Sequence, residues 1–92
     1  VLAGALADRS GMYCCPHTGV ALGALIQLVE KKAIRPDEKV VVVSTAHGLK
    51  FSEFKVGYHE KRLAEVVARH ANPIIECPPD AEAVRNALAG RL

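Results

Sequence analysis

The chain has 92 residues, which is enough for one small domain or for part of a larger one. Half of the residues are apolar and 24% are charged, so the composition is too hydrophobic for a disordered segment. The net charge is +2 and no long basic run occurs, which predicts neither a nucleic-acid partner nor binding to an anionic membrane. The longest apolar stretch, residues 19–29, is about half of the roughly 20 residues that span a bilayer.

The cysteines point to a reducing compartment. Cys14, Cys15 and Cys77 cannot all pair within the chain, and neighbouring cysteines are poorly placed to bridge each other. Residues 1–8 have the pattern of a helix that is already under way, so we expect the chain to be a segment cut from a longer protein.

The first half of the chain predicts a short strand followed by a buried helix. Residues 12–15 are typical of a brief strand, and Thr18 is a candidate cap for a helix that runs to about Lys32. This helix is apolar on most of its faces, which predicts burial. Gly19 and Gly23 lie one turn apart, and we expect another backbone to approach there as the helix packs on a sheet.

Residues 39–45 are the most informative segment, because they contain four consecutive valines. A strand without alternation is covered on both faces, as in a parallel sheet flanked by helices. The fold class predicted is therefore α/β. Only residues 12–15 and 74–77 are candidate neighbours, so we expect most of the sheet to come from residues outside this chain.

The second half predicts two more helices. Over residues 59–70, Leu63, Val66, Val67 and His70 share one face, which is typical of a surface helix. After an extended stretch at residues 74–77, Asp80 is a candidate cap for a final helix that ends at Gly90. The predicted buried face of this last helix consists of Ala81, Val84 and Leu88.

Polar groups follow the valine strand directly. Ser44, Thr45, His47 and Gly48 lie where open α/β sheets bind ligands, beyond the carboxyl ends of the strands. The alternative is that the hydroxyls only satisfy loop backbone groups and that Gly48 only forms a turn.

Two motifs in order resemble a known family. Residues 15–22 (CPHTGVAL) and 41–51 (VVVSTAHGLKF), followed by Tyr58 and His59, are similar to the carboxyl-terminal part of plant-type threonine synthase. The resemblance implies a fold-type II pyridoxal-phosphate enzyme, with a parallel sheet like that of the tryptophan synthase β subunit. It implies the conversion of O-phosphohomoserine and water to threonine and phosphate by a homodimer. The expected location is the plastid stroma in a plant and the cytoplasm otherwise.

The resemblance also implies roles for individual residues. The Thr45 hydroxyl would face the pyridine nitrogen of the cofactor, where it can donate a hydrogen bond but is too weak an acid to protonate the ring. Ser44 could support the same ring edge, and His17 and Thr18 would lie toward the pocket at a helix start. The lysine that forms the Schiff base is expected upstream of this chain, so Lys50 is not assigned that role.

Two alternatives remain open at this stage. Another fold-type II lyase or dehydratase would share the threonine at the strand end, and a small α/β interaction module would use the buried helix as its surface. Zinc binding through Cys14, Cys15 and His17 is not expected, because no second ligand pair with finger-like spacing follows.

Overall fold

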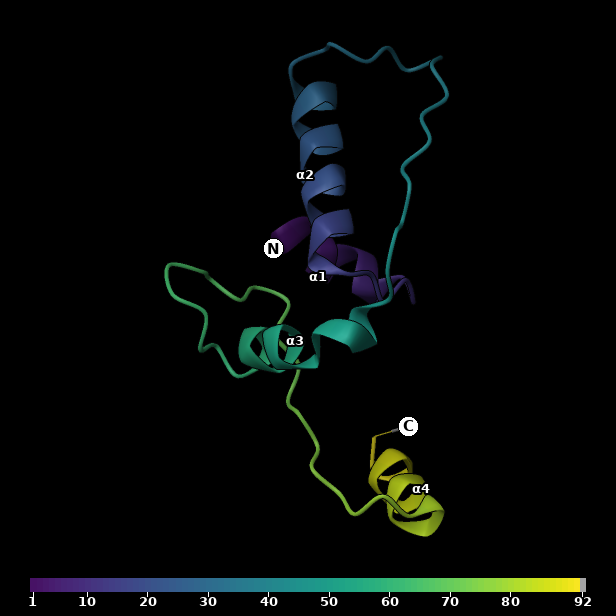
Figure 1. Cartoon of the computed structure of the whole chain (residues 1–92), viewed down its shortest axis with the longest axis vertical. Coiled ribbons are helices and arrows are strands. Elements are labelled where there is room, and N and C mark those ends of the chain that lie inside the picture. Colours follow the sequence, from purple (N-terminus) through teal and green to yellow (C-terminus); the bar gives the residue numbers. More distant parts are fainter. Residues whose placement is uncertain (92) are drawn as a thin grey trace.

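The computed structural model describes residues 1–91 and contains helices joined by long irregular segments (Figure 1). The elements are α1 (Leu2–Arg9), α2 (Pro16–Glu30), the 3-10 helix η1 (Gly48–Phe51), α3 (Ser52–His59) and α4 (Ala81–Ala89). Helix α1 packs against α2, and α3 follows directly from η1. Helix α4, in yellow, lies apart from the other helices in Figure 1.

Two glycines allow α1 and α2 to cross closely. A Cβ atom placed on Gly19 would lie 3.5 Å from the Cα of Gly4, and one placed on Gly4 would lie 3.6 Å from the Cα of Gly19. The close backbone approach predicted at Gly19 is therefore confirmed, although its partner is a helix and not a sheet. The predicted start of the chain in a helix is confirmed by α1.

Helix α2 begins earlier than predicted, because Cys15 and not Thr18 is its N-cap. Cys15 has extended backbone angles, its Sγ accepts a hydrogen bond from the Thr18 amide at 3.4 Å, and Pro16 occupies the first helical position. The helix ends at Glu30, and Lys32 has a φ of 56°, which a continuing helix does not allow.

The predicted parallel sheet is not formed within residues 1–91, where β-pairing is limited to one antiparallel bridge between Cys14 and His47. Residues 39–45 run as an extended trace in Figure 1 without a neighbouring strand. Val41 is 87% exposed, and Val20 on α2 is 71% exposed. The prediction that α2 is buried on most faces is thus wrong for the described residues, because no second layer covers it.

The predicted surface helix over residues 59–70 is also wrong. Helix α3 occupies residues 52–59 instead, and Lys61 and Glu65 have φ values of 60° and 59°. Side chains from the end of α3 take up the backbone donors of the following loop. The Tyr58 hydroxyl accepts from the His70 amide at 3.1 Å, and His59 Nδ1 accepts from the Asn72 amide at 3.0 Å. The positive φ values interrupt the helix, and the His70 amide bonds to Tyr58 instead of a helical carbonyl.

Helix α4 matches its prediction in position. The Asp80 carboxylate accepts from the Ala83 amide at 3.0 Å, and Gly90 is the C-cap. Its predicted apolar face is exposed, however, since Val84 and Leu88 are 43% and 51% exposed. No helix among the described residues is both long and apolar enough to cross a membrane.

Candidate functional site

Two segments far apart in sequence meet beside the start of α2. The Cys15 amide donates to the Ala46 carbonyl at 3.3 Å, and the Gly48 amide donates to the Tyr13 carbonyl at 2.9 Å. A Cβ atom on Gly48 would lie 2.7 Å from the Tyr13 ring, so only glycine permits this approach. The bridge brings the end of the valine segment against the amino terminus of α2.

Three of the four residues assigned to the cofactor site lie in one cluster around the Cys15 sulfur. Thr18 Oγ1 is 3.3 Å from Cys15 Sγ and 3.3 Å from Ser44 Oγ. Thr45 Oγ1 is 4.0 Å from the same sulfur. In each of these three contacts either atom can be the hydrogen-bond donor. The cluster therefore links the helix start to the two hydroxyls that follow the valine segment.

An open hollow lies beside this cluster. Its volume is about 480 Å³, and Met12, Tyr13, Ser44 and Thr45 are among the residues that line it. Ser44 and Thr45 are exposed, whereas Thr18 is buried behind them. The hydroxyls of Ser44 and Thr45 are thus the ones that a molecule in the hollow could reach.

The cluster changes the acidity of its thiol. Hydrogen bonds from the Thr18 side chain and amide lower the pKa of Cys15 from 9.0 to about 6, with smaller contributions from Thr45 and the Ala46 backbone. Burial opposes this shift, because the side chain is fully inaccessible to solvent. Burial and the nearby Asp8 carboxylate raise the pKa of Tyr13.

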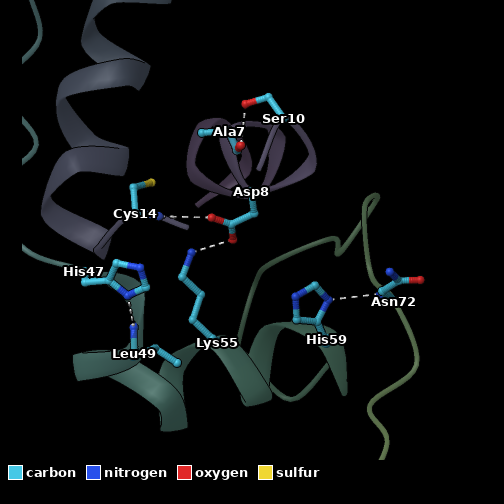
Figure 2. Close-up of polar contacts among 9 residues, drawn as sticks. All are labelled: Ala7, Asp8, Ser10, Cys14, His47, Leu49, Lys55, His59 and Asn72. Carbon is cyan, nitrogen blue, oxygen red and sulfur yellow. Dashed lines mark hydrogen bonds and ion pairs between the residues drawn. The ribbon is translucent and has the colours of Figure 1, made fainter. Parts of the chain in front are cut away.

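A buried ion pair supports the segment that carries Cys15 (Figure 2). Lys55 Nζ on α3 lies 2.5 Å from Asp8 Oδ2 on α1, and both side chains are at least 87% buried. The other carboxylate oxygen of Asp8 accepts from the Cys14 amide at 3.3 Å. Lys55 also lies 4.6 Å from the centre of the Tyr13 ring. The pair therefore fixes residues 13–15 between α1 and α3.

The remaining singled-out residues lie outside the cluster. The His17 ring packs edge-on against Phe51 at 5.7 Å, so its cofactor role stays a prediction. His47 caps η1, because its Nδ1 accepts from the Leu49 amide at 3.2 Å (Figure 2). Lys50 is exposed. Among residues 1–91, no three His, Cys, Asp or Glu side chains gather as a metal site would require.

Sequence reasoning missed the part played by Cys15. Cysteine is an uncommon N-cap, and the more usual cap, Thr18, stands three residues later. The signal was present in Pro16, which favours the first helical position and therefore places the cap at the residue before it.

No family model matches the chain. It is similar to threonine synthase 2, chloroplastic, of Arabidopsis thaliana, with 53% identity over 72 residues. The predicted resemblance to threonine synthase is confirmed. The aligned residues are 78% of this chain and 14% of the Arabidopsis threonine synthase, so the chain spans only a small part of that relative. The similarity supports a segment of a threonine synthase, and the parallel sheet stays a prediction.

The groups at the hollow fit the cofactor that threonine synthases use. Thr45 presents a neutral hydroxyl, which can donate to an aromatic ring nitrogen without transferring a full charge to it. Ser44 offers a second hydroxyl from the adjacent position, and the hollow is open. The fit concerns the ring edge alone, because the Schiff-base lysine is expected elsewhere.

Proposed function

We propose that this chain is the carboxyl-terminal segment of a threonine synthase and forms one wall of its pyridoxal-phosphate site. The proposed reaction converts O-phosphohomoserine and water to threonine and phosphate. The observation that carries the proposal is that Ser44 and Thr45 line one hollow with Thr18 buried behind them, so that the two motifs shared with the family meet there. The name of the Arabidopsis relative supports a location in the plastid if the source is a plant.

Thr45 is proposed to donate a hydrogen bond to the ring nitrogen of the cofactor. When bound, pyridoxal phosphate acts as the electron sink for negative charge that develops on the substrate. A hydroxyl leaves the ring nitrogen unprotonated, and an unprotonated ring withdraws electrons less strongly than a pyridinium ion. Thr45 therefore holds the ring in place and moderates its pull on electrons. Ser44 supports the same edge.

The proposed fold places the valine segment as a central strand of a parallel sheet within a homodimeric enzyme. The exposure of Val40 and Val41 supports this placement, because the side chains of successive residues in a strand point to opposite faces and both faces then require cover. The hydroxyls of Ser44 and Thr45 then follow at the carboxyl end of that strand, where sheets of this class bind ligands. The segment is proposed to lack activity by itself.

The test compares Thr45→Val with Thr45→Ser in the complete enzyme. Valine has the same shape without the hydroxyl, and one neutral hydrogen bond corresponds to a loss of about three- to tenfold in turnover. Serine keeps the hydroxyl and should keep most of the turnover. The cofactor should stay attached to its lysine in both variants, while its absorption spectrum shifts only with valine.

Equal turnover and identical spectra for wild type and Thr45→Val would remove Thr45 from the site. A second measurement titrates the 92-residue chain with pyridoxal phosphate. Saturable Schiff-base absorbance from the chain alone would contradict the assignment of the lysine to another segment.

A further inference from the structure

We propose that Cys15 is a positioning residue, whose sulfur holds the hydroxyls of Thr18 and Thr45 in the orientation that the cofactor site needs. The proposal rests on the proposed function and deepens it. Cys15 does not reach the hollow itself, because its side chain is fully buried, and so it acts through Thr45.

The position of Cys15 is fixed from several directions. Its amide donates to the Ala46 carbonyl, which directly follows Thr45 in the chain. Its sulfur accepts from the Thr18 amide at 3.4 Å as the cap of α2. The sulfur thus stands at a defined point between the helix start and the end of the valine segment. A side chain held in this way can orient the groups that touch it.

Thr45 depends on this sulfur for its internal contact. Among the described residues, the Thr45 hydroxyl has one side-chain partner, Cys15 Sγ at 4.0 Å. The threonine side chain can rotate about its Cα–Cβ bond, so a partner on one side fixes where its oxygen lies. The contact with the sulfur holds the Thr45 oxygen at the edge of the hollow. Removal of the sulfur would release this constraint.

Thr18 and Ser44 extend the same network. Thr18 Oγ1 lies 3.3 Å from Cys15 Sγ and 3.3 Å from Ser44 Oγ, so one hydroxyl connects the sulfur with the second residue of the hollow. The order of contacts is Ser44, Thr18, Cys15 and Thr45. Ser44 and Thr45, at the two ends of this series of contacts, line the hollow, and Thr18 and Cys15 between them are buried. The sulfur is therefore the link that couples the two exposed hydroxyls.

Cys14 offers a matched control. It is also almost completely buried, at 2% exposure, and it adjoins Cys15 in sequence. Cys14 is among the residues that line the hollow, but its sulfur lies near Gly4 of α1 and takes no part in the hydroxyl network within residues 1–91. Replacement of either cysteine by alanine removes a similar volume from the same small core, so the packing loss is comparable.

The experiment measures turnover and the cofactor absorption spectrum of the complete enzyme for Cys15→Ala, Cys15→Ser and Cys14→Ala. We expect Cys15→Ala to lower turnover about three- to tenfold and to shift the spectrum in the same direction as Thr45→Val. Cys15→Ser, which can still donate and accept, should restore most of both. Cys14→Ala should lower thermal stability by a similar amount and leave the spectrum unchanged.

A double variant separates positioning from general packing. In the Thr45→Val background the hydroxyl that Cys15 orients is absent, so adding Cys15→Ala should change turnover by less than about twofold. Multiplied losses in the double variant, or a Cys15→Ala enzyme with the wild-type spectrum, would overturn the proposal. If Thr45→Val itself has no effect, the proposed function fails first, and the two failures are therefore distinguishable.

Discussion

The buried ion pair between Asp8 and Lys55 gives a prediction with a defined magnitude. Replacing Lys55 by methionine keeps the length of the side chain but leaves the Asp8 carboxylate buried without its cation. Breaking a buried pair from one side costs about 3 to 5 kcal/mol. Asp8 retains the Cys14 amide at 3.3 Å, which compensates part of the lost charge contact. We therefore expect a loss near the lower limit, about 3 kcal/mol.

Native-state hydrogen exchange of the Cys14 amide measures this loss locally in the protein that contains the chain. Because 1.4 kcal/mol is a factor of ten, a loss of about 3 kcal/mol corresponds to roughly a hundredfold lower protection. The double variant Asp8→Asn with Lys55→Met removes both charges. In the double variant the Cys14 amide should be better protected than the summed losses of the two single variants predict, since no charge stays buried alone.

The control is an ion pair of equal length on the surface. Arg62 Nε lies 2.5 Å from Glu60 Oε2, but the two side chains are 60% and 37% exposed. Arg62→Met should cost less than about 1 kcal/mol because solvent screens the pair. If Lys55→Met and Arg62→Met lower protection equally, burial of the Asp8 pair does not determine its contribution, and the reasoning is refuted.

Further predictions concern the bridge, the thiol and the last helix. Gly48→Ala places a Cβ atom 3.0 Å from the Cys14 carbonyl, so we expect about 1 to 3 kcal/mol of destabilisation and faster exchange of the Cys15 amide; unchanged exchange would contradict this. The pKa of Cys15 is lower in the folded chain, about 6 against 9.0. Ionisation of Cys15 therefore adds its full contribution to the stability of the fold above pH 9, and this contribution is lost as the pH falls to 6. The thermal midpoint of wild type relative to Cys15→Ser should therefore rise between pH 6 and 9, and a flat difference would argue against the shift. Asp80→Ala removes the cap of α4 and should lower its amide protection by about 1 kcal/mol without affecting turnover; an altered turnover would show that α4 acts on the site.

Local signals predicted the elements that depend on neighbouring residues. Helix α4 follows from Asp80 and Gly90, whose capping chemistry acts within a few residues. The predicted helix at residues 59–70 failed because Lys61 and Glu65 have positive φ values and because the His70 amide bonds to the Tyr58 hydroxyl instead of a helical carbonyl. The Tyr58 hydroxyl and His59 ring reach 12 and 13 residues along the chain. Helical periodicity contains no information about such contacts.

The candidate site was predictable only in part, because some of its features depend on neighbouring residues and others on contacts between distant segments. Ser44 and Thr45 were identified by their position after the valines, and the structure brings them to Thr18, which lies 26 residues before Ser44. The meeting depends on the bridge from Cys14 to His47, and a single bridge leaves no periodic signal in the sequence. The low pKa of Cys15 depends in turn on that meeting, since Thr45 and the Ala46 backbone contribute to it.

The valine segment shows what the described residues leave unsatisfied. Val41 and Val43 are 87% and 72% exposed, although covering a valine side chain fully contributes about 1.5 to 3 kcal/mol. Successive side chains of an extended segment point to opposite faces, so covering Val41 and Val42 requires a layer on each side. Helix α2 also has exposed apolar residues, including Val20. The valine segment and α2 both adjoin the bridge between Cys14 and His47, which positions Thr45. Parts of the complete protein that cover these two apolar surfaces would therefore also restrict the motion of Thr45 at the hollow.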